Sequence, residues 1–153
     1  MRAVQALLRP RLFSLREANA LVPILQITFV RARALRDELQ QAVGELRAAG
    51  APTEPAEIEV DPAASPAVQR LQARGKGLVQ QLTAALREIA ELGIEVKAAD
   101  GLCDFRSHHG GRTIYLCWRF GEERVTHFHE LDTGFTGRKP LPPNGEFTGE
   151  LLH

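Results

Sequence analysis

The segment RVTHFHELDTGFTGRKPL, residues 124–141, holds the densest set of chemically active side chains in this 153-residue sequence. Two histidines separated by one residue, His127 and His129, are followed by Glu130. Two glycines then flank an aromatic residue ahead of Arg138. Such a set can form a metal or ligand site, or the polar face of a small sheet that runs into a turn.

Strand register decides between these interpretations, because a one-residue slip moves every side chain of a strand to the other face of its sheet. A four-residue HHGG turn predicts that Ser107 opposes Arg112 and that Phe105 opposes Ile114. The apolar side chains then share the face that packs on helices: Cys103, Phe105, Ile114, Leu116, Trp118 and Phe120. The other face receives Asp104, Tyr115, Cys117 and Arg119.

The next turn, GEE, has two possible lengths. A three-residue turn pairs Cys117 with His127 and Tyr115 with His129, and it places Phe128 in the core. A two-residue turn exposes Phe128 on the polar face and buries both histidines. Burying one aromatic ring costs less free energy than burying two imidazoles, which need polar partners. We therefore predict the three-residue turn.

This register places Asp104, Cys117, His127 and His129 on one face. One thiolate, two imidazoles and one carboxylate are a chemically suitable set for tetrahedral zinc, and iron is a second possible occupant. Their spacing matches no established zinc signature, so a hydrated or partner-covered sheet face is the alternative interpretation.

Gly134 and Gly137 let the backbone turn sharply around Phe135. Arg138 is therefore expected to lie near Arg119 or Glu122, which suggests a second kind of site. Two guanidinium groups beside backbone N–H groups can hold a carboxylate or a phosphate. The same residues can instead form internal salt bridges, Arg119 with Glu122 or Glu130 and Arg138 with Asp132. The sequence contains neither a G-x-S-x-G nucleophile motif nor a phosphate-binding loop.

The elements that must position these residues follow from hydrophobic spacing. Ser14 and Glu17 have the form of a capping box, and apolar residues then recur at three- and four-residue steps, which predicts a helix over residues 13–49 with a kink near Pro23. An acidic, proline-rich linker covers residues 50–64. A second helix over residues 65–92 completes an antiparallel, coiled-coil-like hairpin.

After residue 93 the hydrophobic period changes to that of β-strands. Residues 94–131 are predicted to form a three-stranded antiparallel meander, with Ile94–Lys97 as a possible additional edge strand. Residues 132–153 follow as a motif loop and an extended tail. The expected fold is α+β, a single domain over residues 1–153 in which the helical hairpin packs on the small sheet.

Composition excludes several classes of protein. The formal net charge is zero, which argues against a nucleic-acid partner, although residues 1–50 carry eight arginines against four acids and residues 51–63 carry four acids and no base. No apolar run approaches the roughly 20 residues that span a bilayer, so we expect no membrane segment. Two cysteines are too few for a disulfide framework, and a cytoplasmic location is expected.

Two segments resemble a family of small uncharacterised prokaryotic proteins, a domain of unknown function. They are FSLREANALVPIL near the start and YLCWRFGEERVTHFHELDTGFTGRKPL near the end, so the resemblance covers nearly the whole chain. The shared motifs do not include Cys103, His108, His109 or His127. The resemblance therefore implies a site made of Arg119, Glu122, His129, Glu130 and Arg138.

Three classes of function follow. The first is a non-enzymatic binding or interaction protein that forms a homodimer through its helices and presents the 117–138 face to a protein or a small anion. The second is a metal-binding protein or metalloenzyme centred on His129, with Cys117, His127 or Glu130. The third is a metal-free enzyme with His129 as general base.

Overall fold

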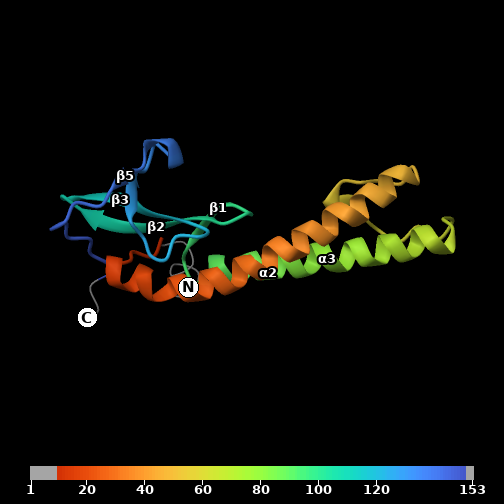
Figure 1. The fold of residues 1–153 in the computed structure, drawn as a ribbon, viewed down its shortest axis with the longest axis horizontal. Coiled ribbons are helices and arrows are strands. Elements are labelled where there is room, and N and C mark those ends of the chain that lie inside the picture. Colours follow the sequence, from red (N-terminus) through yellow and green to blue (C-terminus); the bar gives the residue numbers. More distant parts are fainter. Residues whose placement is uncertain (1–9, 151–153) are drawn as a thin grey trace, which may run out of the picture. The chain divides into compact units, whose positions relative to one another are not determined.

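The computed structural model describes residues 10–150, and its contacts divide the chain into two compact units. Residues up to 29 and from 89 onward form the first unit, and residues 30–88 form the second. The described residues contain two α-helices, two short 3-10 helices and five strands (Figure 1). In chain order these are α2 (Leu15–Ala48), η1 (Pro55–Glu57), α3 (Pro66–Glu91), β1 (Glu95–Ala98), β2 (Leu102–His109), β3 (Arg112–Arg119), β4 (His127–Glu130), η2 (Phe135–Gly137) and β5 (Lys139–Pro140).

Helix α2 begins at the predicted capping box. The Ser14 N–H donates to Glu17 Oε1 at 3.0 Å, and the Glu17 N–H donates to Ser14 Oγ at 3.0 Å. Two of the free N–H groups of the first turn are thereby satisfied, which confirms the motif. The helix continues through Pro23 to Ala48.

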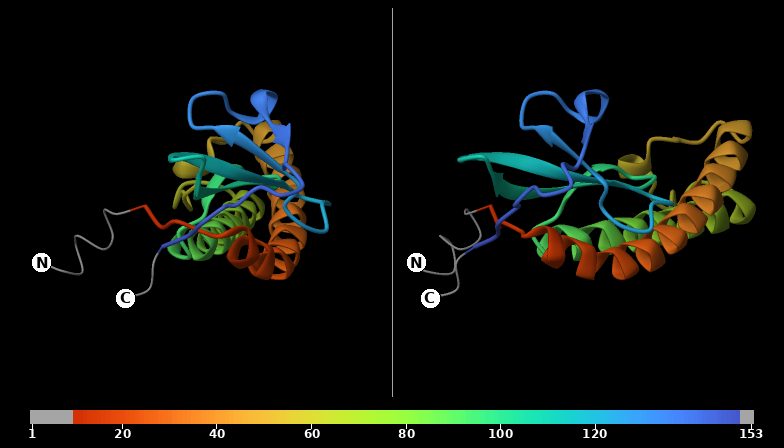
Figure 2. Two further views of the ribbon diagram at one scale, coloured as in Figure 1. Left: turned by 90° about the vertical axis from the view of Figure 1, so that its left-hand side faces the viewer. Right: turned by 60° about the vertical axis from the view of Figure 1, so that its left-hand side comes forward.

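In the first unit, one face of the sheet packs on the start of α2 (Figure 2). Phe13 meets Phe105 edge-on with ring centroids 5.1 Å apart, and Phe29 lies 5.9 Å from Trp118. The predicted apolar face is buried at Cys103, Phe105, Ile114, Leu116 and Trp118. This packing leaves the polar face of the sheet on the side away from α2.

The sheet has five antiparallel strands in the order β1-β2-β3-β4-β5, so the prediction of three strands is wrong. Strand β1 corresponds to the additional edge strand that the sequence suggested. Strand β5 was not predicted, because its two residues, Lys139 and Pro140, show no alternation and proline is rare in strands.

The turn between β2 and β3 is shorter than predicted. His109 pairs with Arg112, so the turn consists of Gly110 and Gly111, whose φ angles are 58° and 76°. Two consecutive positive φ angles are typical of a two-residue hairpin turn, and glycine adopts them without strain. Ser107 consequently opposes Ile114 instead of Arg112. The error is two residues, an even number, so every side chain remains on its predicted face.

The turn between β3 and β4 gives the strand register that the three-residue turn predicted. Cys117 pairs with His127, Tyr115 pairs with His129, and Leu116 pairs with the buried Phe128. The polar face thus carries both histidines.

The second unit consists of residues 30–88, which are the connected ends of α2 and α3 with the linker between them. Its core contains Leu35, Leu39, Ala42, Leu46, Ile58 and Leu78. Ile58 comes from the acidic linker and packs against Gly75 of α3, where a Cβ atom would lie 3.3 Å from Ile58 Cγ2. The next residue, Glu59, forms an ion pair with Lys76 Nζ at 2.6 Å. The linker is therefore docked on the helices by one apolar anchor and one exposed ion pair.

The C-terminal segment follows the edge of the sheet. Thr148 forms an antiparallel bridge with His108, and the Glu150 N–H donates to the Leu12 carbonyl. The predicted tail is thus anchored as far as residue 150, while residues 151–153 lie outside the described part. Within residues 10–150, no helix is long and apolar enough to cross a membrane.

Candidate metal site

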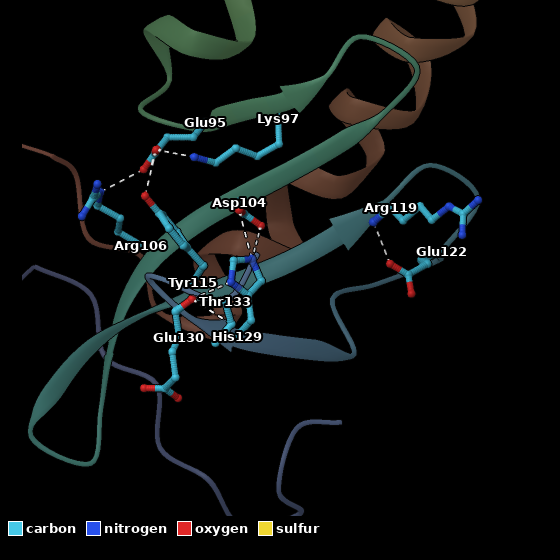
Figure 3. Close-up of polar contacts among 10 residues, drawn as sticks. All are labelled: Glu95, Lys97, Asp104, Arg106, Tyr115, Arg119, Glu122, His129, Glu130 and Thr133. Carbon is cyan, nitrogen blue, oxygen red and sulfur yellow. Dashed lines mark hydrogen bonds and ion pairs between the residues drawn. The ribbon is translucent and has the colours of Figure 1, made fainter. Parts of the chain in front are cut away.

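A buried Asp104–His129 pair lies at the centre of the polar face of the sheet (Figure 3). His129 Nε2 lies 3.0 and 3.1 Å from the two carboxylate oxygens of Asp104, and Nδ1 lies 2.8 Å from the Glu130 carbonyl oxygen. The His129 side chain is 2 % exposed. Strand β2 supplies the acid and strand β4 supplies the imidazole.

The hydrogen-bond partners of the His129 ring indicate where its protons lie. A carbonyl oxygen can only accept, so Nδ1 carries the hydrogen of the bond to Glu130. One further proton is then held between Nε2 and Asp104, which leaves the pair with no net charge. Burial raises the pKa of Asp104, and the neighbouring His129 opposes this rise.

Cys117 on β3 completes a group of three potential metal ligands. It pairs directly with Asp104 in the sheet register. One ligand atom each from Asp104, Cys117 and His129 lies within 4.8 Å of the others, and all three residues are buried. Burial, with the charge of Asp104 as a second cause, raises the pKa of the Cys117 thiol to about 12. The thiol is therefore protonated at neutral pH, which argues against a free cysteine nucleophile.

His127, the fourth predicted ligand, does not join this group. Its Nδ1 lies 2.8 Å from Thr126 Oγ1, although its backbone pairs with Cys117. The predicted register put His127 on the correct face of the sheet. Its ring is turned toward Thr126 by a hydrogen bond, however, and strand register alone does not predict such a bond.

A second cluster surrounds Glu122. Its Oε2 accepts from Arg138 Nη2 at 2.8 Å, and its Oε1 accepts from the Arg119 N–H at 2.6 Å. Both guanidinium groups lie over the Phe135 ring, at 4.9 Å for Arg138 and 5.7 Å for Arg119. Within the described residues, the Nε of Arg138 is buried without a hydrogen-bond partner.

The five residues that the resemblance grouped are thus divided among three places. Arg119, Glu122 and Arg138 are together, and His129 lies with Asp104. Glu130 turns outward and receives two hydrogen bonds from Arg112, at 2.6 and 2.9 Å. Arg138 lies beside Glu122, one of its two expected neighbours, and forms its salt bridge there instead of with Asp132.

The sequence interpretation did not identify a third polar cluster, centred on Glu95 of β1. Tyr115 Oη and Arg106 Nε each donate to Glu95 at 2.9 Å, and Lys97 Nζ donates at 3.1 Å (Figure 3). Burial opposes ionisation of Glu95, but the bonds from Lys97 and Tyr115 outweigh it and lower its pKa. The alternation of Glu95 and Lys97 could have indicated that both side chains lie on the polar face. Because no pairing of β1 with β2 was predicted, their contact with Arg106 and Tyr115 was not expected.

The first part of α2 is hydrogen-bonded to the loop that carries Glu122. Asn19 Oδ1 on α2 accepts the Val125 N–H at 2.8 Å. The Glu122 carbonyl accepts from Gln26 Nε2 at 2.8 Å and from Trp118 Nε1 at 2.9 Å. The N-terminal and C-terminal motifs are therefore parts of one hydrogen-bonded assembly.

A family model described as an uncharacterised conserved protein (DUF2203) matches residues 11–141. The chain belongs to this family. No curated protein and no solved structure matches the chain.

The matched region of the DUF2203 chain contains the capping box, the Glu122 loop and all three potential metal ligands. The family description names no activity.

Proposed function

We propose that this chain binds one divalent metal ion, zinc before iron, through Asp104, Cys117 and His129. The proposal depends mainly on the close approach of three chemically different ligand atoms, within 4.8 Å of one another, in a buried place. A mixed thiolate, imidazole and carboxylate set suits zinc, which accepts sulfur, nitrogen and oxygen ligands.

The orientation of His129 supports this proposal. Histidine ligands generally donate their second ring N–H to a carbonyl or carboxylate, which fixes the tautomer and aims the other nitrogen at the metal. Here the Glu130 carbonyl holds Nδ1, and Nε2 faces Asp104 and the ligand group.

The charge balance is also favourable. The group without metal holds two exchangeable protons, one on Cys117 and one shared by Asp104 and His129. A divalent ion that displaces both protons leaves the net charge of the buried site unchanged, so metal binding adds no uncompensated charge to the interior.

Burial favours a structural site over a catalytic one. Catalytic zinc keeps one position open to substrate, whereas these side chains are almost inaccessible to solvent. One ligand comes from each of β2, β3 and β4, so a bound ion joins three neighbouring strands. We therefore favour a non-enzymatic role. The anion interpretation has less support because Glu122 already neutralises Arg138.

The test is elemental analysis of tag-free protein purified without chelator, beside the double variant Cys117→Ser/His129→Ala. We expect close to one zinc per chain in the parent and loss of the metal in the double variant. Cys103→Ala is the matched control, because Cys103 is an equally buried thiol on the apolar face. It should retain the metal.

His127→Ala tests the composition of the ligand set. Retention of stoichiometric zinc supports the three-residue group, and a large loss of zinc would add His127 as the fourth ligand. Absence of metal from the parent, together with no uptake when it is refolded with zinc, would rule out the metal site.

A further inference from the structure

Arg138 carries a buried hydrogen-bond donor that its present contacts leave unused. The side chain is 13 % exposed, and its Nη2 donates to Glu122 Oε2 at 2.8 Å. The Nε–H of the same guanidinium group is buried and has no acceptor within residues 10–150. A buried donor without an acceptor is costly and uncommon in folded proteins, so this one calls for an explanation.

Strand register places Arg138 on the face of the sheet that carries the proposed metal ligands. Pro140 of β5 pairs with His127, and His127 pairs with Cys117. Cys117 in turn pairs with Asp104. Arg138 lies two residues before Pro140 with extended backbone angles, φ −67° and ψ 141°, so the alternation of the strand directs it to the same face. All of these residues belong to the first unit.

The charge of Arg138 also acts on the Cys117 thiol. Burial and the charge of Asp104 raise the pKa of Cys117, whereas the positive charge of Arg138 lowers it and Glu122 raises it. Both members of the Arg138–Glu122 ion pair are therefore close enough to influence the sulfur. The protonated thiol donates its own hydrogen to Asp104 and is only a weak acceptor, so it does not attract the Nε–H.

We propose that Arg138 donates its Nε–H to the sulfur of Cys117 when a metal ion converts that thiol to a thiolate. The inference rests on the proposed function, because metal binding is what removes the thiol proton. A negatively charged acceptor forms a stronger hydrogen bond than a neutral one. Arg138 is thus a positioning residue, which does not touch the metal but orients and stabilises the sulfur that does.

The surroundings of Arg138 favour an internal acceptor over a dissolved anion. Its Nη2 is occupied by Glu122, and the Phe135 ring lies 4.9 Å from the guanidinium group. A solute would have to reach an Nε atom that protein covers. The sulfur of Cys117 is buried on the same face of the sheet, so it can accept this hydrogen without opening the structure to solvent.

The first test is the zinc affinity of Arg138→Met, measured by competition with a chromogenic chelator. Loss of a hydrogen bond to a metal ligand typically weakens binding 10- to 100-fold, and we expect a loss in that range with one zinc per chain still bound at saturation. Glu122→Gln is the matched control, because it breaks the same ion pair but leaves the Nε–H in place. Metal binding leaves the net charge of the site unchanged, so this variant should bind zinc nearly as tightly as the parent.

Cobalt(II) in place of zinc reports on the sulfur itself. The thiolate-to-cobalt absorption moves to longer wavelength when the sulfur loses a hydrogen bond, because its lone pair rises in energy. We expect this shift in Arg138→Met and no shift in Glu122→Gln or Arg119→Met. The double variant Arg138→Met/Glu122→Gln leaves no unpaired carboxylate and should show the same shift, so it serves if Arg138→Met folds poorly.

The possible results separate this inference from the metal site. A parent that takes up neither zinc nor cobalt would overturn both. A parent that binds metal, beside an Arg138→Met variant with unchanged affinity and absorption, would overturn only the bond from Arg138 to Cys117. Equal losses of affinity in Arg138→Met and Glu122→Gln would also overturn that bond, because the broken ion pair would then account for the effect.

Discussion

At the scale of single residues, burial separates two ion pairs of similar geometry. His129 lies 3.0 Å from Asp104 with both side chains almost fully buried, whereas Arg112 lies 2.6 Å from Glu130 with both side chains substantially exposed. Water stabilises the exposed charges when their partner is removed, and it cannot reach the buried ones. The pair with the longer distance should therefore matter far more to stability.

Asp104→Ala should lower the free energy of unfolding by about 2–4 kcal/mol, because it leaves the buried Nε2 of His129 without a partner. Arg112→Ala should cost much less, because both side chains of its pair are exposed to water. Urea unfolding in the presence of chelator measures both values without a contribution from metal. Equal losses in the two variants would show that the buried pair is not an important part of the core.

Much of this residue-level picture was predictable from the sequence. The face shared by Asp104, Cys117 and His129 follows from alternation, and it survived a two-residue error in the first turn. The separation of His127 from the group was not predictable, because it depends on a side-chain torsion. The neighbourhood of Arg138 and Glu122 was expected from the glycine turn, but the choice of Glu122 over Asp132 as the salt-bridge partner depends on the irregular path of the loop.

At the scale of elements, the loop between β4 and β5 depends on its glycines. Gly134 has a φ of 65°, which disfavours other residues. A Cβ atom on Gly137 would lie 2.5 Å from Thr133 Cβ, so the loop closes on itself at this point. This tight turn brings Phe135 and Arg138 beside Glu122.

Gly137→Ala should therefore destabilise the protein by about 1–3 kcal/mol through overpacking against Thr133. Gly44→Ala is the matched control, because Gly44 is exposed within α2 and its Cβ position meets no atom within 4 Å. That variant should be more stable than the parent by about 0.5–1 kcal/mol, since alanine favours the helix. Thermal and urea unfolding measure the change in stability of each variant, including its sign. A Gly137→Ala variant as stable as the parent would contradict the tight loop closure.

The elements differed in how well the sequence predicted them. The period and the capping box placed α2, and β2 and β3 have clear alternation with turn residues between them. Strand β5 lacks both signals, and its pairing with β4 exists only because the glycine loop returns the chain to that edge. The anchoring of the C-terminal segment beside His108 likewise depends on distant contacts that local patterns do not encode.

At the scale of the whole chain, the two units have separate apolar cores. Phe13, Phe29, Phe105 and Trp118 are buried in the first unit, and the leucines of the hairpin surround Ile58 in the second. All three proposed metal ligands belong to the first unit. Metal binding should therefore stabilise that unit directly, and it can stabilise the second only if the two unfold together.

Hydrogen exchange with and without zinc measures this directly, on protein first stripped of metal by chelator. Free zinc at about 100 times its dissociation constant should slow exchange of the most protected β2, β3 and β4 amides roughly a hundredfold, because binding stabilises the folded sheet by about 2.7 kcal/mol. Amides of residues 30–88 should change far less, since their core contains no ligand. Equal slowing in both units would show that the whole chain unfolds as one cooperative unit. No slowing in the sheet would contradict metal binding at Asp104, Cys117 and His129.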